Sequence, residues 1–136
     1  MNVPEGWQPH TRHSPLTDPW QPIHALEQPR ALQLGLQVCH EHCNSRGLAH
    51  GGLIAALADK AMGLSAVRAA LADGLDLRGA VTASLALDYL DSARIGDWLQ
   101  VQPVVLKTGR TLSFVECHVL SGDRVVARGN ATFRMQ

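Results

Sequence analysis

Two kinds of hydrophobic pattern follow one another along the chain. Residues 53–71 are apolar on almost every side, whereas the segments before and after them alternate between apolar and polar positions. A run that is apolar all round predicts a buried helix, because a surface helix keeps a polar face, and alternation predicts half-buried strands. We therefore expect a helix from about residue 51 to residue 72, ended by Asp73-Gly74.

The alternating segments predict one strand before this helix and four strands after it. The first strand is marked by Leu32, Leu34, Leu36 and Val38. The strand after the helix should carry on one face Val81, Ala83, Leu85, Leu87 and Tyr89. Further strands are expected at residues 98–107, where Pro103 indicates an edge or a bulge, at 111–120 and at 124–134.

The turns between the last strands are short, at Gly109-Arg110 and at 121–123. Consecutive strands with short turns pair antiparallel, so the pattern predicts an α+β domain with one long helix on one face of the sheet. One sheet cannot cover a helix that is apolar all round. We therefore expect a partner subunit.

Residues 1–30 differ from the rest, because they hold six of the seven prolines together with Trp7 and Trp20. Prolines this dense exclude a long helix and a central strand. We interpret residues 1–30 as an N-terminal arm and residues 31–136 as one domain. The tryptophans favour an arm that docks on the protein, and the sequence leaves room for a short helix around residues 23–27.

Composition narrows the function classes. The 12 basic and 12 acidic residues give a formal net charge of zero, which points away from nucleic acid and anionic membranes. The longest apolar stretch is broken by charged residues, so no membrane span is expected, and the first residues lack the apolar core of a secretion signal. Three cysteines leave one unpaired in any disulfide scheme, which predicts reduced thiols and a cytoplasmic protein.

A polar and glycine-rich loop leads into the helix, with the sequence Asn44-Ser45-Arg46-Gly47-Leu48-Ala49-His50-Gly51-Gly52. Asp59 follows in the third turn of the apolar run. A carboxylate there needs a partner, a water-filled cavity or a raised pKa. N–H groups at a helix start lack partners within the helix, so this junction combines an oxyanion site with an acid.

The motif Asn44-x-x-Gly47-x-x-His50-Gly51-Gly52, followed by Leu57-Ala58-Asp59, resembles the PaaI-like (phenylacetyl-CoA thioesterase-like) group of hotdog-fold thioesterases. The resemblance continues through residues 81–90, Gly96-Asp97 and 107–111, and covers roughly residues 32–134. It implies a hotdog fold, a long central helix wrapped by an antiparallel sheet. It also implies a homodimer with a continuous sheet, often paired into a homotetramer. The arm lies outside the shared pattern, and could close the pocket or brace a neighbouring subunit.

The implied activity is hydrolysis of an acyl-CoA to the free acid and coenzyme A, without a metal and without a cofactor beyond the coenzyme A of the substrate. The Gly51 N–H would be the main oxyanion donor, and Asp59 would either attack the carbonyl or take a proton from water. Asp59 is about 12 Å along the helix from Gly51, so one subunit cannot easily bring them together. Antiparallel helices in the implied dimer would set Asp59 of one subunit against Asn44, His50 and Gly51 of the other.

Other residues receive roles from the same resemblance. Asn44 would bind the acyl carbonyl or hold the nucleophile, His50 would fix the loop and polarise the next peptide, and Thr82 would place a hydroxyl near Asp59. The substrate would be contacted by Gly52, Leu53, Met62, Leu85, Lys107, Arg110 and Thr111, the basic ones lying at the entrance for coenzyme A. No tyrosine is expected near the helix start, and the acyl group stays open between aryl and medium-chain.

Each role has a structural alternative. Gly51-Gly52 could simply form a tight turn, Asn44 a turn and His50 a helix cap, and Thr82 could be a surface residue. Asp59 could pair with Lys60, which points elsewhere on the helix, or with Arg68, which lies about 13 Å further along.

A run of metal-type side chains, Cys39-His40-Glu41-His42-Cys43, precedes the loop. In a strand its members would divide between two faces, and no second ligand pair is present, so we expect no metal site. Two rival functions are an acyl-CoA-binding hotdog module without catalysis and a hydratase or dehydratase of the same fold. Retention of Asp59 argues against the module, and the asparagine-to-aspartate spacing favours hydrolysis over hydration.

Overall fold

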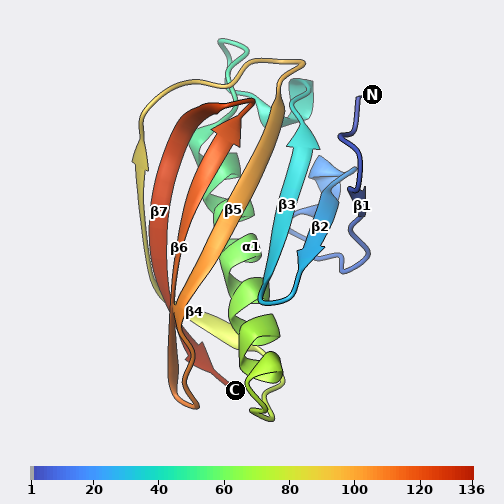
Figure 1. The fold of residues 1–136 in the computed structure, drawn as a ribbon. Helices are drawn as coiled ribbons and strands as arrows, with labels where there is room; N and C mark the ends of the chain where they lie inside the picture. Colours follow the sequence, from blue (N-terminus) through green and yellow to red (C-terminus); the bar gives the residue numbers. More distant parts are fainter. Residues whose placement is uncertain (1) are drawn as a thin grey trace.

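The computed structural model describes residues 2–136 and consists of one long helix packed on a seven-stranded antiparallel sheet (Figure 1). The helix, α1, spans Gly51–Ala72. It ends where predicted, because Gly74 adopts a left-handed backbone with φ of 83°, which a residue with a side chain rarely takes. The predicted helix is thus confirmed at both ends.

The strands follow the predicted order, with two additions from the N-terminal arm. They are β1 (Gln8–Pro9), β2 (His24–Gln28), β3 (Ala31–Gln37), β4 (Ala80–Tyr89), β5 (Trp98–Lys107), β6 (Leu112–Ser121) and β7 (Arg124–Met135). Their order across the sheet is β1-β2-β3-β5-β6-β7-β4, so β4 forms one edge and the arm forms the other. Two short 3-10 helices complete the chain, η1 (Asp18–Trp20) and η2 (His40–His42). The predicted α+β arrangement is confirmed.

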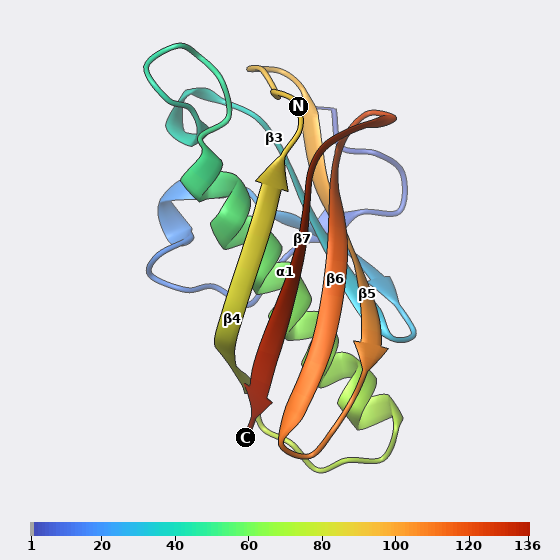
Figure 2. The ribbon, with the colours of Figure 1, turned by 90° about the vertical axis from the view of Figure 1, so that its left-hand side faces the viewer.

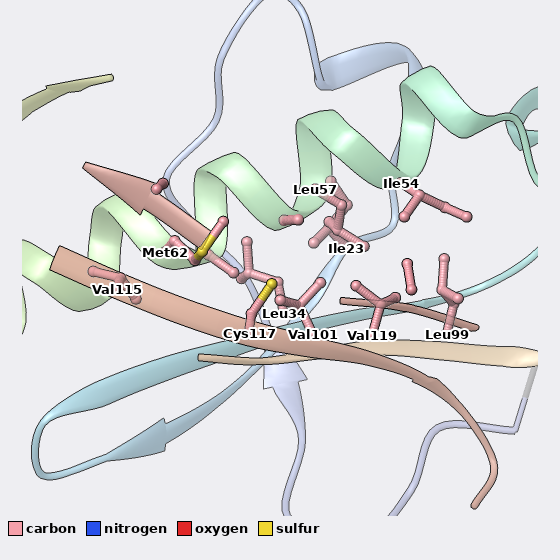
Figure 3. Close-up of a cluster of buried hydrophobic side chains, with 14 of the residues drawn as sticks. Ile23, Leu34, Ile54, Leu57, Met62, Leu99, Val101, Val115, Cys117 and Val119 are labelled. Carbon is pink, nitrogen blue, oxygen red and sulfur yellow. The ribbon is translucent and has the colours of Figure 1, made fainter. Parts of the chain in front are cut away.

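The core lies between α1 and the inner face of the sheet (Figure 3). From the helix it receives Leu57 and Met62, and from the strands it receives residues such as Leu34, Val101 and Val119, all of them fully buried. On β6 the residues that alternate toward the core are Ser113, Val115 and Cys117.

The opposite face of α1 departs from the expected burial on all sides. It is half-exposed and consists largely of glycine and alanine, with Asp59 and Lys60 in the middle. Glycine and alanine count as apolar in the sequence, so this face was expected to be buried. Their side chains are too small to fill the space over the helix.

The arm docks on the sheet, as the tryptophans indicate. Trp7 is buried, and its ring meets that of Trp98 edge-on with centroids 5.2 Å apart. The suggestion of a short helix at residues 23–27 is wrong, because His24–Gln28 pairs with β3 as β2. Pro22 and Pro29 flank this strand and interrupt none of its pairs, which is how a proline-rich segment can still join a sheet.

The residues on the inner face of β4 are not all those predicted to share one face of this strand. A bulge at Ala83 leaves Thr82 opposite Phe133 and Ser84 opposite Thr132, so the alternation shifts by one residue. Thr82 therefore shares a face with Leu85, Leu87 and Tyr89, while Val81 does not. Bulges re-aim side chains in this way, and here the result is a threonine directed at the helix.

Pro103 lies on β5 beyond the last residue that pairs with β3, Val101. At that point β5 is bonded only to β6, so the predicted edge position is confirmed locally. Within residues 2–136, no helix combines the length and the apolar character that crossing a bilayer requires.

Candidate active site

The start of α1 is capped by the side chain of His50. The Nδ1 atom of His50 accepts a hydrogen bond from the Gly52 N–H at 2.8 Å, and His50 adopts the extended backbone of an N-cap residue. The capping role considered for His50 is therefore present. Because the Gly52 N–H is occupied, the Gly51 N–H is the glycine donor at this helix start that meets no protein acceptor within residues 2–136. It can bind a developing oxyanion.

Asn44 shapes the loop that leads to this start. Its Oδ1 atom accepts hydrogen bonds from the N–H groups of Arg46 and Leu48 at 2.9 and 3.2 Å. This is the turn-forming role, and it engages only the amide oxygen, while Nδ2 donates to no protein acceptor within residues 2–136. Asn44 can thus support the turn and donate a hydrogen bond at the same time.

The helix start has a tyrosine beside it, against expectation. The Tyr89 hydroxyl donates to the Gly51 carbonyl at 2.7 Å, and partial burial raises its pKa. A Cβ atom added to Gly51 would lie 3.5 Å from the Tyr89 ring, so the two are in contact. Sequence reasoning missed this residue because 38 positions separate it from Gly51. The signal available was its place on the same face of β4 as Leu85 and Leu87.

Asp59 receives a hydrogen bond from Thr82, whose Oγ1 atom donates to Oδ1 at 2.7 Å. The predicted proximity of this hydroxyl to the carboxylate is present, and the bulge at Ala83 produces it. The second carboxylate oxygen, Oδ2, has no protein donor within residues 2–136, so it is free to attack a carbonyl or take a proton from water.

The basic residues that could have neutralised Asp59 are engaged elsewhere. Lys60 donates to the Arg12 carbonyl and to the Thr17 hydroxyl at 3.1 and 3.0 Å, and partial burial lowers its pKa. Arg68 reaches the carbonyl of Gln28. In the described part of the chain no basic side chain forms an ion pair with Asp59, so the purely structural alternative loses its partners.

Two cavities lie along the half-exposed face of α1. One, of about 300 Å³, contains Asp59 and Thr82. The other, of about 440 Å³, lies at the helix start and is lined by His50, Gly52 and Leu53. Thus the acid and the helix start open onto the same side of the molecule, but into separate cavities within one chain.

The residues predicted to contact substrate divide into three groups. Gly52 and Leu53 line the cavity at the helix start. Met62 is a correction: it is fully buried against the sheet and lines neither of these cavities, because its place on the helix belongs to the face that packs on the core. Leu85 is 38% exposed on β4, on the same face as Thr82, beside the free edge of the sheet.

The predicted entrance residues Lys107, Arg110 and Thr111 lie at the other end of the molecule. The turn that carries them is tied to the end of α1, since Thr108 donates to Asp73 at 2.6 Å. The Arg30 guanidinium and the Thr108 hydroxyl lower the pKa of Asp73 to about 2. The helix has 22 residues and is therefore about 33 Å long, so one chain does not bring these residues to its own Gly51.

Residues 39–43 do not form a strand, in contrast to the assumption behind the prediction on metal ligands. They contain η2, in which the buried His42 accepts from the Cys39 N–H and donates through Nε2 to the Trp20 carbonyl at 2.8 Å. These contacts give His42 a structural role that sequence reasoning missed: it fastens the arm beside the helix start.

Comparison with known proteins places this geometry in a family. The model of the thioesterase superfamily matches residues 46–128. A putative esterase from Pseudomonas aeruginosa is 39% identical over 137 residues, covering 99% of this chain and 98% of the relative. Acyl-coenzyme A thioesterase 13 from Mus musculus is 28% identical over 108 residues, which are 76% of this chain and 72% of the relative.

Among solved structures, a mutant of the phenylacetic acid degradation protein PaaI from Thermus thermophilus superposes with a TM-score of 0.75 at 24% identity, covering 90% of this chain and 100% of the other. The hotdog fold expected from the resemblance is thereby confirmed. With a family model that spans more than half of its residues, this chain belongs to the thioesterase superfamily and is a thioester hydrolase of the hotdog fold.

Proposed function

We propose that this protein hydrolyses an aryl- or medium-chain acyl-CoA to the free acid and coenzyme A, at a site shared between two subunits. The observation that carries the proposal is the Asp59 carboxylate, which Thr82 orients at 2.7 Å inside a cavity on the open face of α1 and which no basic side chain of residues 2–136 neutralises. The name of the mouse relative, an acyl-coenzyme A thioesterase, supports coenzyme A as the carrier of the acyl group.

The reaction follows from what each group can do. The Gly51 N–H binds the carbonyl oxygen as it gains negative charge, and the helix dipole adds to this stabilisation. Asp59 either takes a proton from the water that attacks the carbonyl carbon, or attacks it directly and forms a mixed anhydride that water then opens. The carbon–sulfur bond breaks, and the coenzyme A thiolate leaves and takes up a proton.

The dimer is part of the proposal, because about 12 Å of helix separates Asp59 from Gly51 within one chain. Strand β4 supports it. This strand has ten residues and an unpaired edge, and it carries the exposed apolar side chains Val81, Leu85 and Tyr89. A long apolar edge favours pairing with another strand, and pairing with a second β4 would make the sheet continuous.

In such a dimer the two helices run antiparallel, and Asp59 of one subunit faces Asn44, His50 and Gly51 of the partner. In this arrangement the entrance turn at residues 107–111 of one subunit lies near the helix start of the partner. The basic side chains of the turn can there meet the coenzyme A phosphates. Assembly into a homotetramer and a cytoplasmic location stay predictions.

The test is thiol release from a panel of aryl- and alkyl-CoA thioesters by wild type and Asp59→Asn. We expect kcat to fall on the order of 10²–10⁴-fold in the variant, because the amide can neither attack nor accept the proton. The matched control is Asp123→Asn in the exposed turn before β7, which should keep wild-type rates. Binding of acyl-CoA by wild type without turnover on any thioester would replace hydrolysis with the binding-module function.

A further inference from the structure

The arm forms part of both cavities on the open face of α1. Residues Arg12 to Thr17 pass over the cavity that contains Asp59, and Leu16 and Trp20 line the cavity at the helix start. In the described part of the chain, only Leu16 and Ala56 line both. Figure 2 shows this blue segment beside the first half of the helix, on the side away from the sheet.

The segment is fastened on both sides of Leu16. Lys60 reaches from the helix to the Arg12 carbonyl, which precedes Leu16, and to the hydroxyl of the buried Thr17, which follows it. Further along the arm, the buried His42 donates to the Trp20 carbonyl at 2.8 Å. Between these anchors Leu16 remains 66% exposed. An apolar side chain is thus held in a fixed place over an unfilled space.

The surface of the helix beneath the arm is built to leave that space. The positions facing it include Gly52, Ala56 and Gly63, which carry at most one carbon beyond the backbone. A larger residue at Ala56 would fill this gap. At the two glycines the neighbours limit the side chain, because a Cβ atom would lie 3.2 Å from the Phe133 ring at Gly63 and 3.0 Å from Nδ1 of His50 at Gly52. What remains is the pair of cavities, with the helix as their floor, the arm as their outer wall and Leu16 where they adjoin.

An acyl group must occupy such a space when its carbonyl is at Gly51. The coenzyme A part needs water and charged partners, so the acyl part extends the other way, along apolar surface. At the helix start this surface is supplied by Leu53 from the helix and by Leu16 and Trp20 from the arm.

The geometry points to the arm as the specificity wall of the acyl site, with Leu16 as the residue that sets the acyl length. This inference rests on the proposed hydrolysis of acyl-CoA. With Leu16 in place, the cavity at the helix start takes a compact acyl group, aromatic or of medium chain length. Without it, the two cavities join, and a longer chain can continue toward Ala56 and Gly63. Lys60 is a positioning residue, which acts through the arm.

The experiment measures kcat/KM across acyl-CoA thioesters from butanoyl to dodecanoyl, with benzoyl and phenylacetyl, for wild type, Leu16→Ala and Leu16→Trp. We expect the dodecanoyl-to-hexanoyl ratio to rise about tenfold in Leu16→Ala, and to fall in Leu16→Trp, because a few methylenes gain or lose apolar contact. Leu16 is exposed, so both variants should fold normally. The matched control is Leu71→Ala, an exposed leucine at the far end of the helix, which should keep the wild-type ratio.

A variant of Lys60 tests whether its hydrogen bonds hold the arm over the helix. Lys60→Met keeps the aliphatic stem and removes the donors to Arg12 and Thr17, so we expect KM to rise and the chain-length preference to flatten while kcat for the best substrate stays within about threefold. If Lys60 only stabilised the fold, Lys60→Met would lower the melting temperature without altering the dodecanoyl-to-hexanoyl ratio. That result would overturn the positioning role.

Failure of the specificity wall and failure of the proposed hydrolysis would give different results. Turnover by wild type with the same chain-length profile in both Leu16 variants would overturn the wall and leave the hydrolase intact. The absence of wild-type turnover on the whole panel would overturn the proposed function and the wall with it.

Discussion

The two edges of the sheet are finished in opposite ways. At the arm edge, the strand β1 is two residues long and contains Pro9, and Trp7 closes over Trp98. At the other edge, β4 has ten residues, an unpaired backbone and several exposed apolar side chains. A short strand with proline blunts an edge, whereas a long apolar one invites pairing. The arm edge is therefore closed within the chain, and the β4 edge remains open to pairing.

The groups of the proposed active site lie beside the open edge. Thr82 and Tyr89 both belong to β4, and they bond to Asp59 and to the Gly51 carbonyl respectively. A partner that pairs with β4 would therefore meet the catalytic groups directly. This difference between the edges connects the proposed assembly to the proposed activity.

The largest effect is expected from Leu85→Glu in the middle of β4. Pairing of two β4 strands about a two-fold axis would bring the two new carboxylates close together, so the dimer should dissociate. Because the proposed site uses groups of both subunits, activity should fall at least about 10²-fold. Light scattering after size exclusion gives the mass and thiol release gives the rate. The control is Gln8→Glu on β1, which should change neither; equal losses from both variants would remove the contrast between the edges.

A smaller effect is expected from Thr82→Val, which keeps the shape of the side chain and removes its hydroxyl. Asp59 would lose the donor that orients it, and kcat should fall on the order of 10- to 10²-fold with little change in KM, since one hydrogen bond to a charged group is worth about 1.5–3 kcal/mol. Thr82→Ser should recover most of the rate. An unchanged kcat in Thr82→Val would show that the contact with Asp59 has no part in the reaction.

The smallest effect on activity is expected at the closed edge. Trp7→Ala removes a buried ring from Trp98 and should lower the free energy of unfolding by about 3 kcal/mol. Urea unfolding measures this loss. The mass of the assembly and kcat should stay at wild-type values, because Trp7 lines neither cavity of the candidate site. A monomer or an inactive protein would mean that the arm edge also serves assembly.

Much of the fold could be predicted from local sequence. The helix was bounded correctly because an apolar run lies between Gly51-Gly52 and Asp73-Gly74, and both signals act within a few residues. The strand β2 was missed because the prolines around it suppress the strand pattern, although Pro22 and Pro29 lie outside its pairs. The bulge at Ala83 was missed because a shift by one residue depends on the partner strand β7.

The site was predictable in its parts and not in its arrangement. Asp59, His50 and Gly51 were identified from their place around a helix start, and the contact of Thr82 with Asp59 came from the resemblance. Tyr89 was excluded from the helix start by sequence reasoning, because only the path of β4 brings its ring there. The place of Leu16 over the helix depends on Lys60 and His42, and such long-range hydrogen bonds leave no periodic signal.

The central claim is that one active site uses Gly51 of one subunit and Asp59 of the other. Gly51→Pro removes the N–H at the first helical position, where proline is well tolerated, so the helix should form while the oxyanion donor is lost. Alone, Gly51→Pro and Asp59→Asn should each be inactive. Mixed and refolded in equal amounts, they should recover about a quarter of wild-type activity, since half of the dimers are mixed and each has one intact site of two. Mixed dimers identified by native mass spectrometry that show no activity would contradict the shared site.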